Sequence, residues 1–328
     1  MIPYTWLTEA KDRIEPYIRN TPLTYDPVNE IYLKWENQQI TGSFKARGAF
    51  NKVISLQDWE RQLGLVAASA GNHGQGVAIA GNLFHAPVTI FAAESAAPIK
   101  ISAMRSLGAD VHLVPGGYGD AEIAGLDYAK QSGATWISPY NDGQIIAGQG
   151  TIGLEVLAEL HGSVQPPAWI VPVGGGGLIS GIGIAVKEAP LSSLAGSQSG
   201  NVPKVIGVQS NASPFFHAIF HQGSQTGVRE LPSLADGLAG PVEDGSITIP
   251  IVRRYVDELI LVSEDEIAQA IAYAHQKYQQ TIEGSSAAAL AAVIFNKIKL
   301  RPAVVVISGG NIQPELHKSI CAINRGIV

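Results

Sequence analysis

The chain has 328 residues, and its hydrophobic share of 46% excludes a disordered chain and is enough for a large core. The 22 basic and 28 acidic residues give a net charge of −6 without a long basic run, which excludes nucleic acid as the main partner. The single cysteine, Cys321, excludes an internal disulfide framework and a cysteine-rich metal site, and it fits a reducing, cytoplasmic setting.

The sequence shows neither a secretion signal nor a membrane span. The first 22 residues carry several charges and have no apolar core of signal-peptide length. No later stretch has the roughly 18 to 20 uninterrupted apolar residues of a spanning helix. We therefore expect a soluble protein without a membrane partner.

Predicted strands and helices alternate along most of the chain. The predicted strands are 31–35, 65–68, 88–91, 111–114, 135–138, 169–173, 205–208, 259–262 and 303–307. The predicted helices are 8–18, 45–56, from the turn at 69–74 to about 81, 97–107, 118–131, 149–161, 178–187, 264–278 and 287–299. Residues 191–201, rich in Ser and Gly, are predicted as a loop. Strands separated by such helices indicate parallel βαβ units with helices on both sheet faces, and residues 50–141 suffice for a compact unit.

Lys45 lies between an aromatic and a small residue, just after the predicted strand 31–35 and its turn. Gly42 and Ser43 form a turn or helix start before it, and small or apolar side chains follow it. Such surroundings desolvate the ammonium group, which lowers the pKa of a lysine and favours the neutral amine that Schiff-base chemistry needs. A lone lysine is more often a solvated charge, so this interpretation depends on the distant segments below.

Four consecutive glycines, Gly174, Gly175, Gly176 and Gly177, lie between a predicted buried strand and a helix. Unblocked N–H groups and the positive end of the helix would hold a phosphate there. A glycine run is also a common plain turn, but four at such a junction favour the anion site. The segment does not match the dinucleotide fingerprint, because Ile179 stands where the last glycine would be.

Two polar turns follow other predicted strands. The segment 69–74 offers hydroxyl, amide and imidazole groups, and with a phosphate site and a lysine nearby it can hold a substrate carboxylate. The plainer interpretation is a helix cap by Ser69 with an incidental His73. The segment 308–311 follows the last strand, where ligands gather beyond the carboxyl ends of parallel strands, although Ser308 can equally be a capping serine.

Six motifs, in the family's order, resemble the fold type II pyridoxal-phosphate enzymes, and within them the serine/threonine dehydratase and serine racemase family. They are Ser43-Phe44-Lys45-Ala46-Arg47-Gly48-Ala49, Ser69-Ala70-Gly71-Asn72-His73-Gly74-Gln75-Gly76, Ile146-Ala147-Gly148-Gln149-Gly150-Thr151, the tetraglycine segment, Ala235-Asp236-Gly237 and Ser308-Gly309-Gly310-Asn311. The resemblance covers nearly the whole chain. It implies an α/β fold of two doubly wound domains with mainly parallel sheets, like the tryptophan synthase β chain. Residues 1–49 and 142–328 would form the large cofactor-binding domain, and 50–141 a small substrate-gating domain.

The resemblance also implies the role of each site residue. Lys45 would hold pyridoxal 5′-phosphate covalently and act as the catalytic base. The other expected cofactor-binding residues are Phe44 on the pyridine ring, Asn72 on the ring hydroxyl, Gly174, Gly175, Gly176 and Gly177 on the phosphate, and Ser308 on the pyridine nitrogen. The substrate carboxylate would be bound by the turn of Ser69, Ala70, Asn72 and His73. A neutral serine at the ring nitrogen makes the ring a weaker electron sink, which favours elimination.

The implied reaction is β-elimination from L-threonine or L-serine, giving a 2-oxo acid and ammonia. Alternatives that the motifs leave open are a lyase for 3-hydroxyaspartate or phenylserine, a β-replacement synthase, a serine racemase, and a binding protein without catalysis. Racemases resembling this chain have a second serine where Ala70 stands, and Ala70 cannot exchange a proton. The segment 139–142 likewise looks like the dehydratases. Elimination by one base is therefore favoured over racemisation.

Three further expectations come from comparison with the family. Relatives that bind a divalent cation use a glutamate after the predicted strand 205–208, but this chain has Gln209, so no such metal site is expected, although Asp236, Glu283 or a monovalent ion remain candidates. The sequence ends soon after Asn311, so a regulatory domain and feedback inhibition are not expected. A homodimer is the default assembly.

Overall fold

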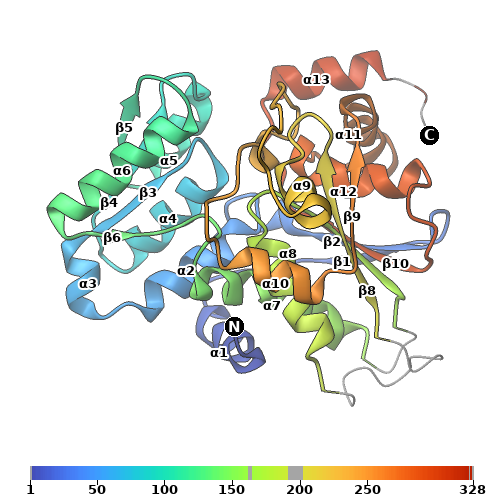
Figure 1. Cartoon of the computed structure of the whole chain (residues 1–328), viewed down its shortest axis with the longest axis horizontal. Helices are drawn as coiled ribbons and strands as arrows, with labels where there is room; N and C mark the ends of the chain where they lie inside the picture. The colour runs from blue at the N-terminus through green and yellow to red at the C-terminus, as the bar shows by residue number, and fades with distance from the viewer. Residues whose placement is uncertain (1, 162–164, 191–201, 325, 327–328) are drawn as a thin grey trace.

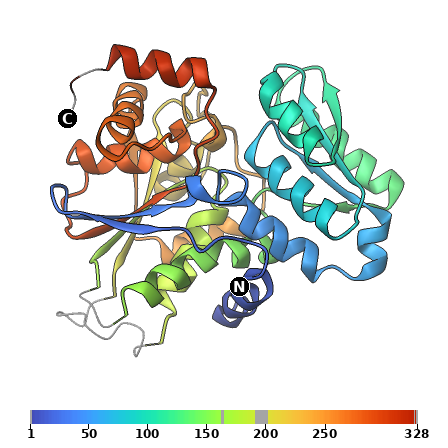
Figure 2. The same ribbon diagram turned by 180° about the vertical axis from the view of Figure 1, so that it is seen from behind.

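The computed structural model describes residues 2–161, 165–190, 202–324 and 326, and it shows two sheets, each with helices packed around it (Figure 1; Figure 2). The predicted α/β class with mainly parallel sheets is confirmed. The predicted loop at 191–201 lies outside the described residues.

The larger sheet has six strands in the order β1-β2-β10-β7-β8-β9. Along this order the strands are β1 (Leu23–Asp26), β2 (Ile31–Trp35), β10 (Ala303–Ile307), β7 (Ala168–Pro172), β8 (Lys204–Ser210) and β9 (Glu258–Val262). Neighbouring strands are parallel except β1 and β2, which are antiparallel. The end of β2 therefore lies beside the end of β10, with Trp35 opposite Ile307.

The smaller sheet has four parallel strands in the order β5-β4-β3-β6. They are β5 (Asp110–Val114), β4 (Val88–Ala93), β3 (Leu65–Ala68) and β6 (Thr135–Trp136). Strand β6 is shorter than the predicted 135–138, because the Ser138 hydroxyl accepts from the Asn141 N–H at 2.9 Å and starts a turn.

The helices connect these strands and mostly match the predicted ones. They are α1 (Tyr4–Ile14), α2 (Lys45–Ser55), α3 (Asp58–Leu63), α4 (Asn72–Leu83), α5 (Pro98–Ser106), α6 (Tyr118–Ser132), α7 (Gly143–Glu159), α8 (Gly177–Lys187), α9 (Phe215–Gln222), α10 (Thr248–Tyr255), α11 (Glu264–Tyr278), α12 (Gly284–Ile294) and α13 (Pro314–Ile323). Helix α1 ends before the predicted residue 18 because Pro16 has no N–H to continue the ladder. None of the helices in the described ranges combines the length and apolar character needed to cross a membrane.

The side chains of strand β10 pack in two hydrophobic cores, one on each face of the large sheet. Ala303, Val305 and Ile307 pack with α11 and α12, while the alternate residues Val304 and Val306 pack with α7 and α8. The smaller sheet is covered in the same way, by α2, α4 and α5 on one face and α6 on the other. Helix α2, whose first residue is Lys45, thus follows strand β2 of the large sheet in sequence and packs on the small sheet. Figure 1 shows this helix between the two parts of the molecule.

Candidate active site

Lys45 is the first residue of α2, and the turn before it is held by the segment that follows β10. Ser43 and Gly309 form an isolated antiparallel bridge. The Phe44 N–H donates to the Ser308 carbonyl at 3.0 Å. Two of the six motifs, far apart in sequence, therefore meet directly, and the second of them holds the start of α2.

The Lys45 amine lies in a partly closed environment. Its Nζ donates to the Pro139 carbonyl at 2.8 Å and lies 5.2 Å from the centroid of the Phe44 ring. Burial lowers the pKa of Lys45 to about 8, while the nearby Glu283 carboxylate acts in the opposite direction. A share of the amine is therefore neutral near pH 8, as Schiff-base chemistry requires.

Asn72 begins α4, and its amide is fixed from both sides. Its Nδ2 donates to Glu283 Oε1 at 2.8 Å, and its Oδ1 accepts from Asn311 Nδ2 at 2.7 Å. Asn311 Nδ2 also donates to the Thr41 carbonyl at 2.8 Å. Two of the six motifs thus meet at Asn72, together with Glu283.

Ser69 and His73 flank this turn and make local contacts. The Ser69 hydroxyl accepts from the Gly71 N–H at 3.0 Å. His73 is buried, and its Nε2 lies 2.8 Å from the Ile137 carbonyl. A carbonyl accepts only, so Nε2 carries the hydrogen and Nδ1 is left as an acceptor. Burial and the positive charge of Lys45 lower the pKa of His73 to about 3, so the ring is neutral.

A cavity of about 300 Å³ opens beside the turn, and its wall includes Ser69, Ala70, Phe91, Lys100, Tyr118 and Asp236. Lys100 of α5 pairs with Asp236 at 3.0 Å across it. An added Cβ on Gly71 would lie 3.3 Å from Lys100 Cδ, so the lysine stem covers the turn. Ala70 presents only a methyl group to this cavity.

The four glycines form the strand-to-helix junction that the sequence predicts. Gly176 has φ of +85° and is the N-cap of α8. Within the described part of the chain, no hydrogen bond is donated by the backbone N–H groups of the four glycines 174–177. A Cβ on Gly175 would lie 2.4 Å from the Tyr140 ring. The junction offers free donors at the positive end of a helix and has no space for side chains.

Ser308 follows β10 and is buried. Its Oγ lies 3.1 Å from Ser286 Oγ, and Ser286 Oγ accepts from the Gly309 N–H at 2.6 Å. Ser308 therefore belongs to a hydroxyl network at the carboxyl end of the sheet and has a neutral partner.

A family model for pyridoxal-phosphate dependent enzymes matches residues 14–309. The chain belongs to this family. It is 42% identical to an L-threonine ammonia-lyase of Thermotoga maritima, over 100% of this chain and 80% of the relative. It is 39% identical to the catabolic L-threonine dehydratase TdcB of Escherichia coli strain K12, over 94% of this chain and 92% of the relative. The crystal structure of serine racemase from Dictyostelium discoideum is similar with a TM-score of 0.83 at 33% identity, covering 95% of this chain and 99% of that one.

Pyridoxal phosphate is the cofactor of this family, and the residues present fit it. Lys45 supplies an amine with a lowered pKa for the aldehyde group. The free N–H groups at the start of α8 suit a phosphate, and a Cβ on Gly175 or Gly176 would collide with the ring of Tyr140 or Phe216. The buried hydroxyl of Ser308 suits a neutral pyridine nitrogen.

No metal centre is assigned in this member of the pyridoxal-phosphate family. Within 2–161, 165–190, 202–324 and 326, no three His, Cys, Asp or Glu side chains are grouped as ligands. Gln209, the last residue but one of β8, accepts from the His217 N–H at 3.0 Å. Asp236 and Glu283 are engaged with Lys100 and Asn72 instead.

The sequence analysis missed the role of Glu283 in this site, noting it only as a candidate cation ligand. Glu283 is buried, and burial, reinforced by the charge of Asp236, raises its pKa to about 7, although Asn72, Lys100 and Lys45 lower it. The signal in the sequence was a lone carboxylate between Ile282 and a run of small residues.

Glu283 is expected to make the apo-protein less stable as the pH rises. The unfolded carboxyl ionises near pH 4.5 and the native one near pH 7, so the native state binds more protons between these values and loses stability across that window. Relative to Glu283→Gln, wild-type protein should lose up to about 3 kcal/mol of unfolding free energy between pH 5 and pH 8. Urea unfolding of both proteins at the two pH values measures this, and a constant difference would contradict it.

Proposed function

We propose that this member of the pyridoxal-phosphate family is an ammonia-lyase that converts L-threonine and L-serine to a 2-oxo acid and ammonia. The observation that carries the proposal is the combination of Lys45, whose pKa is lowered to about 8, with Ala70, which presents a methyl group to the cavity. The substrate site then has a base at Lys45 and no exchangeable proton at Ala70. A single base favours elimination over racemisation.

The turn at the start of α4 is the proposed carboxylate site. The His73 ring donates to the Ile137 carbonyl, so we assign the role of His73 to its backbone N–H. The N–H groups of Asn72 and His73 and the Ser69 hydroxyl would bind the carboxylate at the positive end of the helix. Ala70 would line the space for the substrate.

The other residues hold the cofactor and move one proton. Gly174, Gly175, Gly176 and Gly177 would bind the phosphate, Phe44 would pack on the ring, Asn72 would bind the ring hydroxyl, and Ser308 would face the ring nitrogen. When bound, pyridoxal phosphate supplies an electron sink for the bond that breaks at the substrate Cα. Lys45 Nζ would hold the cofactor, be displaced from it by the substrate amine and then take the Cα proton, while the β-hydroxyl would leave as water.

The proposal also includes the division into domains, the assembly and the location of the protein. We assign 50–141 as a small domain that gates the substrate site, and 1–49 with 142–328 as the cofactor-binding domain. The boundary at residue 50 falls inside α2, which packs on α4 and α7. A homodimer in the cytoplasm is proposed from the family resemblance and from the single cysteine.

A panel of hydroxy amino acids tests the substrate. Release of 2-oxo acid by protein saturated with pyridoxal phosphate should be fastest with L-threonine or L-serine. Phenylserine, 3-hydroxyaspartate and the D-enantiomers serve as comparisons. Release from a bulkier or acidic analogue, with none from threonine and serine, would refute the substrate assignment and leave the lyase chemistry in place.

Ala70→Ser should add an exchangeable proton at position 70, where the wild-type side chain has none. Ala70 is exposed on the cavity wall, so the added hydroxyl meets no packed core. Formation of D-serine from L-serine, relative to 2-oxo acid, is expected to rise by roughly 10²-fold, the scale of general acid–base catalysis. Chiral chromatography of the reaction measures the ratio, and an unchanged ratio in a variant that still eliminates water would argue against the one-base account.

A further inference from the structure

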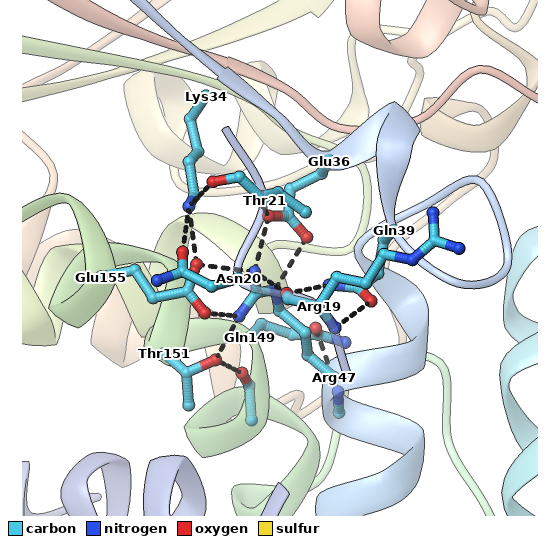
Figure 3. Close-up of polar contacts among 12 residues, drawn as sticks. Arg19, Asn20, Thr21, Lys34, Glu36, Gln39, Arg47, Gln149, Thr151 and Glu155 are labelled. Atoms are coloured by element: carbon cyan, nitrogen blue, oxygen red, sulfur yellow. Dashed lines mark hydrogen bonds and ion pairs between the residues drawn. The ribbon is translucent and has the colours of Figure 1, made fainter. Parts of the chain in front are cut away.

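Arg47 lies two positions after Lys45 on α2, and its guanidinium is buried between two carboxylates (Figure 3). Its Nε and Nη2 donate to Glu36 at 2.7 and 2.8 Å. Its Nη1 and Nη2 donate to Glu155 at 2.6 and 2.9 Å, and Nη1 also reaches Thr151 Oγ1 at 3.1 Å. Paired hydrogen bonds of this kind fix orientation as well as distance, so the Arg47 side chain is held in one pose.

A second cation balances the charge of this cluster. Lys34 Nζ donates to Glu155 Oε2 and to the Thr21 carbonyl, both at 2.6 Å, and the Thr21 hydroxyl donates to Glu36. The side chains of Lys34, Arg47 and Glu36 have no exposed surface, and that of Glu155 is 8% exposed. Buried ion pairs often stabilise a fold no better than apolar packing would, so their value here depends on what they hold in place.

The ion cluster connects three parts of the chain: the end of β2, the first turn of α2, and α7. Glu36 follows β2 directly, Arg47 is in the first turn of α2, and Glu155 is in α7. The start of α2 has no side-chain cap, although its first turn needs partners for free N–H groups. In the same region Gly48 N–H donates to Gln149 Oε1 of α7 at 3.2 Å. The position of this turn is therefore set by contacts with Glu36 after β2 and with α7, in addition to the segment after β10 that holds Ser43 and Phe44.

Lys45 and Arg47 point to different sides of α2. Residues two apart in an α-helix are separated by about 200° around its axis. Lys45 reaches the Pro139 carbonyl in the site, and Arg47 reaches the ion cluster on the other side. A rotation or shift of the first turn that loosened Arg47 would therefore move Lys45 as well.

We propose that Arg47, fixed by Glu36 and Glu155, is a positioning residue that sets the place of the Lys45 amine in the site. The inference rests on the proposed function, in which Lys45 holds the cofactor and takes the substrate proton. Misplacement of a catalytic group by 1 Å costs about 10²-fold in rate, so such an anchor affects turnover without touching substrate.

The main test uses the charge-balanced variant Arg47→Met/Glu36→Leu, which leaves the Lys34–Glu155 pair intact. Arg47→Lys keeps the charge and loses the paired geometry, so it is the milder second variant. Lys52→Met is the matched control, because Lys52 also links α2 to α7 through Asp142 at 2.7 Å but lies further along the helix. Thermal unfolding of each apo-protein reports whether it folds.

Two readouts separate positioning from stability. In apo-protein, the pH midpoint of Lys45 acylation by an amine-selective reagent, followed by peptide mass spectrometry, should lie near pH 8 in the wild type and in Lys52→Met. In the charge-balanced variant it should move toward 10.5, the ordinary lysine value, and in Arg47→Lys by a smaller amount. In cofactor-loaded protein, kcat for threonine should fall by about 10²-fold in the charge-balanced variant while KM changes little, and Arg47→Lys should recover part of the loss.

A folded charge-balanced variant with the wild-type acylation midpoint and wild-type kcat would overturn the proposal. If that variant does not fold, the proposal is overturned by a folded Arg47→Lys with the wild-type acylation midpoint and wild-type kcat. If no substrate of the panel is turned over by the wild type, the proposed function fails, yet the acylation midpoints of the apo-proteins still decide whether Arg47 positions Lys45.

Discussion

Replacement of Lys45 by alanine is expected to lower kcat/KM for L-threonine by about 10⁴-fold or more, because one side chain both holds the cofactor and serves as the base. The visible absorption band of lysine-bound cofactor should disappear as well. Stability should not suffer, because the partly buried Lys45, whose pKa is lowered to about 8, costs free energy below that pH. Loss of activity would then reflect lost chemistry in a folded protein.

Lys52→Ala is the control for this experiment. Lys52 lies on the same helix and pairs with Asp142 near the surface, so its removal should leave the absorption band and turnover unchanged. An unchanged band in Lys45→Ala, or residual turnover within tenfold of the wild type, would rule out the assigned role of Lys45.

Gly176→Ala is expected to weaken binding of pyridoxal phosphate by about 10²-fold, which corresponds to nearly 3 kcal/mol. Gly176 has φ of +85°, a conformation that L side chains rarely adopt, and a Cβ there would lie 2.5 Å from Phe216. Relief of this contact must move the start of α8, where the free N–H groups are. Titration of apo-protein with cofactor, followed by absorbance, measures the affinity.

Gly223→Ala separates backbone strain from damage to the cofactor site. Gly223 has nearly the same φ, +86°, and nothing lies within 4 Å of its Cβ position. Both variants should lose stability in thermal unfolding, but Gly223→Ala should bind the cofactor normally. Equal affinities in the two variants would show that the glycines at 174–177 do not hold the phosphate.

The local pattern of apolar and polar residues was enough to predict most strands and helices of the fold. The predicted strand 303–307 is observed as β10, and its alternate residues pack in two different cores, as the prediction of helices on both sheet faces requires. The prediction was wrong at several element ends. Helix α7 starts at Gly143 instead of 149, because the Asp142 carboxylate caps it through the Gln144 and Ile145 N–H groups. Short helices such as α9 and α10 were missed, since a two-turn apolar pattern differs little from a buried loop.

The sequence predicted which turns after strands carry the site residues, but it did not predict which side chains contact one another there. The motifs around Lys45, Asn72 and Ser308 were visible because glycine and small polar residues follow predicted strands. Their partners were not visible, because Asn72 and Glu283 are separated by 211 positions and no spacing rule joins them. The same holds for Arg47 and Glu155, which are 108 positions apart. Such pairs depend on the order of strands in the sheet, which the sequence pattern leaves open.

Borohydride reduction of the cofactor-loaded protein tests the central claim most directly, because it fixes the cofactor to the amine that holds it. After digestion, the expected result is a pyridoxyl group on one peptide, at Nζ of Lys45, with the peptide carrying Lys52 unmodified beyond background. Modification at another lysine, such as Lys100 on the cavity wall, or no modification in protein that binds the cofactor, would contradict the account.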